Sequence, residues 1–150
     1  MTDMRMAISA KRRAKLTVLI DTNIFVALYD KNDPTHKQAA NMFASLPSDA
    51  RLVTTSEIVG ESITVIAMKV GKDFALRLIS EIVNIELLFV EEIIFYKAIE
   101  VFKRIKSKNV SFVDCVSFVI AREKRFGIDC VFTFDRHFKT QGVVLLSDLV

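Results

Sequence analysis

The sequence predicts an α/β protein, a three-layer α/β/α sandwich around a mostly parallel central sheet. Short apolar segments rich in Val, Ile and Leu alternate with longer segments whose apolar residues recur every three or four positions. No hairpin turn sequences join the apolar segments, and the 150 residues include only four Gly and two Pro. Strands that alternate with helices in this way pair in parallel, because each connection has to cross over the sheet.

The first strand is expected at Leu16–Ile20, a β-branched and apolar segment without alternation, which is typical of a strand that is buried on both faces. Asp21-Thr22-Asn23 follows it and offers N-cap side chains to a short helix at Ile24–Tyr29. A second helix is expected over 34–46, since a proline stands in its first turn and a Pro-Ser-Asp sequence follows its end.

The next unit consists of a strand at Arg51–Thr55 and a long helix, capped by Ser56, that reaches about Val70. Gly71 ends this helix, and an amphipathic helix follows over Lys72–Val83. The apolar positions of the amphipathic helix, which we expect to face the core, are Ala75, Leu78, Ile79 and Ile82.

The second half of the chain begins with a strand at Ile85–Val90 and a helix over Glu91–Lys106, whose acids come first and bases last, as the helix dipole favours. A further helix runs from Ser111 to near Gly127, and the closing strands are expected at 130–134 and 143–146. The buried stripe of the 91–106 helix is expected at Ile94, Ala98, Val101 and Ile105.

Composition indicates one domain with a substantial core, because 51% of the residues are hydrophobic and 26% are charged. The formal net charge of +3 comes from residues 1–15, which hold five basic side chains and one acidic one. We expect 1–15 to be a flexible basic extension, or to be shortened by a start at Met4 or Met6, and 16–150 to form the domain. No uncharged run is long enough to span a membrane, and two cysteines make no disulfide scaffold, so we expect a soluble cytoplasmic protein.

Two carboxylates, Asp21 and Asp135, each come directly after a predicted strand. Local structure offers an explanation for both: Asp21 is a good helix N-cap, and Asp135 suits a cap or an Asx turn. Thr22 or Asn23 could cap the first helix instead, which would leave Asp21 free to face the end of the strand. Thr133, two residues before Asp135, shares its side of the chain.

Two more carboxylates, Glu61 and Asp114, lie in the opening turns of predicted helices. Asp114 stands in the otherwise uncharged segment 112–121, where a capping box with Ser111 is the local explanation. Glu61 would need an Arg or Lys partner if it is buried, and Glu57, one turn earlier, is its rival for a functional role. On the predicted helix, Glu61 interrupts an apolar stripe formed by Ile58, Val65 and Met68.

A parallel sheet brings the ends of its strands and the starts of the following helices to one edge, so these four acids are expected to meet there. Four neighbouring carboxylates repel one another unless a cation joins them, and oxygen-only ligands favour Mg²⁺ or Mn²⁺. Zinc is not indicated, since the two histidines are far apart and the two cysteines lack the C-x-x-C spacing. An acid-walled Mg²⁺ site without a P-loop sequence points to a metal-assisted phosphodiesterase rather than an ATP- or GTP-binding protein.

Four motifs carry a resemblance to a known family: DTNIF at 21–25, TTSEIVGES at 54–62, SFVDCVSFVIARE at 111–123 and FTFDRHF at 132–138. In this order and spacing they resemble the PIN domain and, more narrowly, the VapC-like toxins of toxin–antitoxin pairs. The resemblance implies an endoribonuclease for single-stranded RNA whose Mg²⁺ or Mn²⁺ is held by Asp21, Glu61, Asp114 and Asp135. It also implies a supporting hydroxyl at Thr133 and a polar helper at Asn23. A homodimer and a small antitoxin partner are implied as well, and the basic extension of residues 1–15 is a departure from most relatives.

Binding of single-stranded or structured RNA needs cations outside the acid cluster. Arg136 and His137 stand beside Asp135, and Lys103 and Arg104 belong to the densest basic run, although such runs are commonly solvated helix ends. Two alternatives stay open: an RNA-processing nuclease without an antitoxin, and a non-catalytic module whose acidic groove binds a basic partner or a structural ion.

Overall fold

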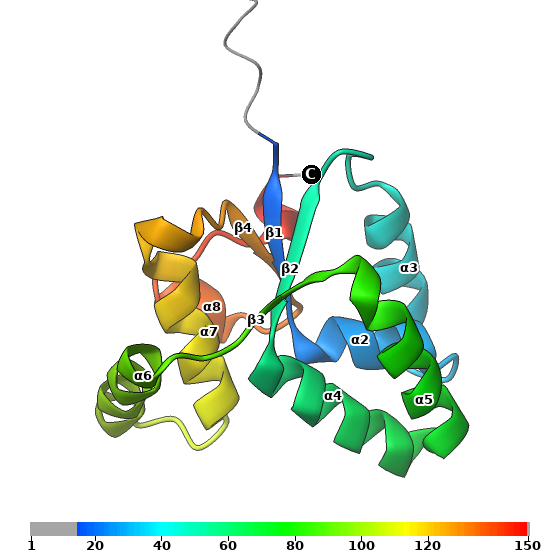
Figure 1. The fold of residues 1–150 in the computed structure, drawn as a ribbon, viewed down its shortest axis with the longest axis horizontal. Coiled ribbons are helices and arrows are strands. Elements are labelled where there is room, and N and C mark those ends of the chain that lie inside the picture. The colour runs from blue at the N-terminus through cyan, green and yellow to red at the C-terminus, as the bar shows by residue number, and fades with distance from the viewer. Residues whose placement is uncertain (1–14, 150) are drawn as a thin grey trace, which may run out of the picture.

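The computed structural model describes residues 15–149, which form a parallel sheet between two groups of helices (Figure 1). The sheet has four strands in the order β3-β2-β1-β4, and every pairing is parallel. The strands are β1 (Thr17–Ile20), β2 (Arg51–Thr55), β3 (Glu86–Leu88) and β4 (Cys130–Phe132). The predicted α/β fold with a parallel sheet is therefore confirmed. Residues 1–14, most of the predicted basic extension, lie outside the described part of the chain.

The helices fall on two sides of the sheet, α3, α4 and α5 on one side and α6 and α7 on the other (Figure 1). Short 3₁₀ turns follow α5 and α7 and end the described chain, at Ile82–Asn84, Lys124–Phe126 and Leu146–Asp148. The helices are α2 (Thr22–Tyr29), α3 (His36–Ala44), α4 (Ser56–Lys69), α5 (Lys72–Glu81), α6 (Glu92–Arg104), α7 (Phe112–Arg122) and α8 (His137–Thr140). None of the helices formed by residues 15–149 is long and apolar enough to cross a membrane.

The core is centred on β1, in which Val18, Leu19 and Ile20 are wholly buried, as expected for a strand covered on both faces. Phe118 of α7 and Phe138 of α8 meet edge to face beside it, with ring centroids 4.7 Å apart. A packed core of this kind holds the ends of the strands in fixed positions, which any site at the sheet edge requires.

The strands predicted at 85–90 and 130–134 are shorter in the structure, where they form β3 (Glu86–Leu88) and β4 (Cys130–Phe132). β3 ends at Leu88 because the chain then turns toward α4, where the N–H of Val90 donates to the Ser56 hydroxyl at 3.3 Å. The predicted strand at 143–146 is wrong: only an isolated parallel bridge joins Val131 to Leu145. The N–H of Leu145 is instead bound by the Asp148 carboxylate at 3.3 Å, within the closing 3₁₀ turn.

Local helix details also differ from the predictions. Thr55, not Ser56, caps α4, since the Thr55 hydroxyl accepts from the N–H of Ile58 at 3.1 Å. Ile79 of α5 is 44% exposed rather than part of the core. The helix predicted to end near Gly127 ends at Arg122, and Gly127, at φ 62°, closes the 3₁₀ turn that follows.

Candidate active site

A cavity of about 360 Å³ lies at the edge of the sheet where the strands end. Each of the four predicted carboxylates lines it, and they reach it from different elements: the end of β1, the second turn of α4, the first turn of α7 and the loop after β4. The residues that line the cavity are Asp21, Thr22, Asn23, Val26, Asp33, Thr35, Glu61, Val65, Lys69, Ser111, Asp114 and Asp135.

Asp21 is the most buried of these acids, with 3% of its surface exposed. It occupies the N-cap position of α2, yet its side chain makes no capping bond. Its Oδ2 instead accepts a hydrogen bond from the Thr133 hydroxyl at 2.8 Å. Burial, with smaller contributions from the charges of Asp114 and Glu61, raises the pKa of the Asp21 carboxyl to about 7. The capping explanation for Asp21 therefore fails, and the carboxylate faces the cavity.

Thr133 and Asn23 join the start of α2 to the end of β4. The Asn23 amide donates to the Thr133 hydroxyl at 2.9 Å and to Asp21 at 3.3 Å, and its oxygen accepts from the N–H of Phe134 at 3.2 Å. The Thr133 hydroxyl also accepts from the N–H of Asp135 at 3.1 Å. This network fixes the backbone around two of the acids and orients the buried carboxylate of Asp21.

Glu61 lies beside the buried face of α4 and accepts a hydrogen bond from the Thr22 hydroxyl at 2.6 Å. The apolar stripe expected around Glu61 is wrong in part, because Met68 is 82% exposed. The buried residues of α4 are Ile58, Ser62 and Ile66. Glu57 is bound by the Ser56 hydroxyl and does not line the cavity.

Asp114 forms the expected capping box with Ser111: its Oδ2 accepts from the Ser111 N–H at 2.9 Å, and the Ser111 hydroxyl accepts from the Asp114 N–H at 3.1 Å. Burial, followed by the charges of Asp135 and Glu61, raises the pKa of the Asp114 carboxyl despite this capping. The Asp114 carboxylate thus caps the start of α7 and also lines the cavity.

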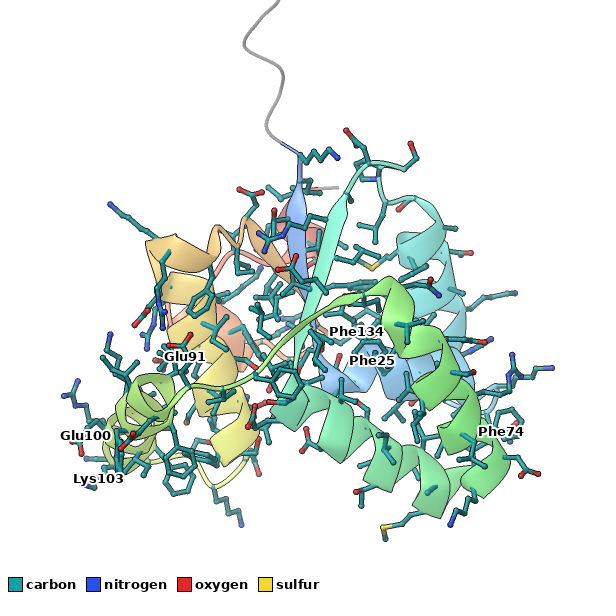
Figure 2. The ribbon with its side chains drawn as sticks, in the orientation of Figure 1. Phe25, Phe74, Glu91, Glu100, Lys103 and Phe134 are labelled. Carbon is teal, nitrogen blue, oxygen red and sulfur yellow. The ribbon has the colours of Figure 1, made fainter. Side chains whose placement is uncertain are left out.

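Asp135 forms the expected turn with His137, whose N–H donates to Oδ1 at 2.9 Å and whose ring Nδ1 lies 2.7 Å from the same oxygen. None of the four predicted RNA contacts, His137 included, is among the residues that line the cavity. Arg136 is exposed, Arg104 lines a different hollow between α6 and α7, and Lys103 pairs with Glu100. Figure 2 shows Lys103 and Glu100 together at the outer side of α6.

Among residues 15–149, none of the four predicted acids is paired with an arginine or lysine. Their oxygen donors suit a hard divalent ion. In the same part of the chain, no three acidic, histidine or cysteine side chains stand close enough to enclose a metal ion as they are. Mutual repulsion keeps uncompensated carboxylates apart, so a bound cation requires them to draw closer.

Thr22, Asp33 and Lys69 are among the lining residues that were not predicted from the sequence as site residues. Thr22 stood beside Asp21 as a possible cap, but its bond to a glutamate 39 positions away has no local signal. Asp33 and Lys69 have ordinary explanations as a turn residue and as a cation near a helix end.

A parallel α/β fold with an acid-lined cavity at the carboxyl ends of its strands defines a class of proteins that act on phosphate esters or bind cations. The PIN domain family profile matches residues 18–143, and the chain belongs to this family. It is similar to the VapC20 toxin of Mycobacterium tuberculosis, a toxin that cleaves the sarcin–ricin loop, with a TM-score of 0.74 and 27% identity over 85% of this chain and 96% of that one. It also shares its fold with a chain of VapBC-1 from nontypeable Haemophilus influenzae, with a TM-score of 0.55 and 18% identity over 87% and 96% of the two chains. No curated protein sequence matches it significantly.

Proposed function

We propose that this protein is a metal-dependent endoribonuclease that cleaves single-stranded RNA, and that it acts in the cytoplasm as the toxin of a toxin–antitoxin pair. The observation that carries the proposal is the convergence of Asp21, Glu61, Asp114 and Asp135 on one cavity, with no arginine or lysine of the described chain paired to them. Membership of the PIN domain family and the similarity to the VapC20 toxin support the same conclusion.

Asp21, Glu61, Asp114 and Asp135 are the residues proposed to hold Mg²⁺ or Mn²⁺. Such an ion, when bound, lowers the pKa of a water molecule and offsets negative charge on a reacting phosphate. The chain's own residues orient the carboxylates beforehand. Thr133 and Asn23 hold Asp21, and Thr22 holds Glu61. Partners of this kind commonly change metal affinity or activity by about 10- to 100-fold when removed.

The sarcin–ricin loop cleaved by VapC20 makes a single-stranded or loop segment the substrate class to test first. The similarity to a VapBC structure supports an antitoxin partner, and a homodimer is proposed on the same family grounds. Two alternatives make different predictions. An RNA-processing nuclease cleaves RNA without a neighbouring antitoxin gene, and a non-catalytic module binds Mn²⁺ or a basic partner without cutting RNA.

The test is cleavage of single-stranded RNA by the purified protein with Mg²⁺, with Mn²⁺ and with EDTA. We expect cleavage with either metal, none with EDTA, and a loss of at least about a hundredfold in Asp21→Asn and Asp114→Asn. Glu57→Gln is the matched control, because Glu57 is an acid of α4 outside the cavity, and it is expected to cut like the wild type. Full activity in either Asp variant would remove that residue from the proposed site.

A further inference from the structure

Lys69 is the one basic side chain among the residues that line the acid cavity. It lies in the last turn of α4, and with Glu61 and Val65 it forms a line at four-residue spacing along the face of the helix that borders the cavity. Its side chain is exposed, so its ammonium group can reach a molecule that enters from solvent.

No ion pair within the described chain accounts for Lys69. The charge of Lys69 acts on Asp33, whose carboxylate is already bound by the N–H of Thr35 at 2.8 Å and by the Thr35 hydroxyl at 2.6 Å. Lys69 contributes only a secondary part to the lowered pKa of Asp33, after the Thr35 hydrogen bonds. No ion pair within 4.0 Å joins the side chains of Lys69 and Asp33. The remaining local explanation is a cation at the end of a helix, worth a few tenths of a kcal/mol at an exposed position.

A polyanion that approaches this cavity meets five carboxyl groups: Asp21, Asp33, Glu61, Asp114 and Asp135. A divalent ion offsets this charge at the reacting phosphate but not along the rest of the RNA backbone. The Lys69 ammonium at the rim of the cavity is therefore placed to attract a second phosphate of the RNA backbone, whose charge the divalent ion does not offset.

We propose that Lys69 binds a backbone phosphate of the RNA that flanks the phosphate held at the carboxylates, and so sets the path of the strand across α4. This inference rests on the proposed function. Eight residues separate Lys69 from Glu61, which corresponds to about 12 Å along the helix axis. This distance suits a flanking phosphate rather than the one that reacts.

The test compares Lys69→Gln and Lys69→Arg with Lys72→Gln, a matched control that removes a nearby exposed lysine outside the cavity. Binding of a fluorescently labelled single-stranded RNA is measured by anisotropy in Ca²⁺ over a range of salt concentrations, and KM and kcat are measured in Mn²⁺. We expect Lys69→Gln to bind about fivefold more weakly, with KM raised and kcat little changed. The slope of log affinity against log salt is expected to become shallower by about 0.7, the value of one single-strand phosphate contact. Lys69→Arg is expected to restore both values.

The outcomes separate this inference from the proposed function. Equal affinities and salt slopes in Lys69→Gln and Lys72→Gln would overturn the Lys69 contact while cleavage by the wild type stands. If the wild type binds RNA without cleaving it, and Lys69→Gln shows the expected change in salt slope, the nuclease function is overturned and the Lys69–phosphate contact stands. A wild type that neither binds nor cuts RNA would overturn both. A loss of thermal stability in Lys69→Gln with unchanged salt slope would assign Lys69 to the helix end alone.

Discussion

Asp21→Asn should make the metal-free protein more stable at neutral and alkaline pH, although it alters a residue of the proposed site. Asp21 is 3% exposed, and its pKa is raised from 3.8 to about 7, first by burial and then by neighbouring charges. An asparagine keeps an oxygen that can accept the hydrogen bond from the Thr133 hydroxyl. The substitution therefore removes a buried negative charge with little change of shape.

The sign follows from proton binding. Between pH 4 and 7 the folded state keeps the Asp21 proton while the unfolded state has released it, so the free energy of unfolding falls as the pH rises through this window. A shift of roughly three pKa units at about 1.4 kcal/mol per unit sets a ceiling of about 4 kcal/mol on this loss. Asp21→Asn does not lose this free energy of unfolding, because an asparagine does not ionise. The variant is therefore expected to be no more stable than the wild type at pH 4, and its gain in stability is expected to be greatest above pH 7. For a chain of 150 residues, 2–4 kcal/mol corresponds to roughly 5–15 °C in Tm.

The measurement is thermal or urea unfolding of both proteins in EDTA, from about pH 4 to pH 8.5. The difference between the two proteins isolates Asp21 from Asp114, whose pKa is also raised by burial. Asp49→Asn, at an exposed acid in the loop before β2, is the control and is expected to show no growing advantage with pH. An Asp21→Asn protein that is less stable than the wild type above pH 7, or a difference that does not change with pH, would refute the burial argument.

Two further predictions concern the same cavity. In a thermal scan, Mn²⁺ in excess of its Kd is expected to raise the Tm of the wild type by an amount that grows with the Mn²⁺ concentration. The double variant Asp21→Asn/Asp114→Asn is expected to gain little. Equal Tm shifts in the two proteins would place metal binding elsewhere. Thr133→Val leaves Asp21, Asn23 and the N–H of Asp135 without their shared partner, and is expected to cost about 1–3 kcal/mol in urea unfolding, while Thr133→Ser retains most of the stability and the cleavage. Loss of stability in Thr133→Ser equal to that in Thr133→Val would show that packing, not the hydroxyl, matters.

The central strand of the sheet was predictable because a strand that is buried on both faces consists almost entirely of apolar residues. The segment Leu16–Ile20 contains only one polar residue, Thr17, and this composition is typical of a central strand covered on both faces. The segment 143–146 has the same apolar character and forms only a bridge. The N–H of Leu145 donates to the Asp148 carboxylate and that of Val143 to the Phe138 carbonyl, and such competition with a strand depends on three-dimensional context.

The position of the four acids was predictable from topology, since parallel strands end at one edge. The hydrogen-bond partner of Glu61 was not. Thr22 bonds to Glu61 across 39 positions, and Lys69 has an adequate local explanation at a helix end. Sequence patterns depend on residues that are close together along the chain. A contact between α2 and α4 does not change the apolar pattern of either helix, so it cannot be predicted from that pattern.

Asp114 and Asp135 both make the local hydrogen bonds predicted for them and line the cavity, whereas Asp21 lines the cavity without making its predicted capping bond. Asp114 caps α7 and Asp135 forms a turn with His137, and both still line the cavity. Their charges are partly compensated by backbone N–H groups even without a cation. Asp21 is different, because it makes no capping bond, is 3% exposed, and accepts side-chain hydrogen bonds from the neutral Thr133 hydroxyl and Asn23 amide. A carboxylate in this state gains more from a bound cation than its neighbours do. Metal affinity should therefore fall furthest when Asp21 is replaced, ahead of Asp114 and Asp135.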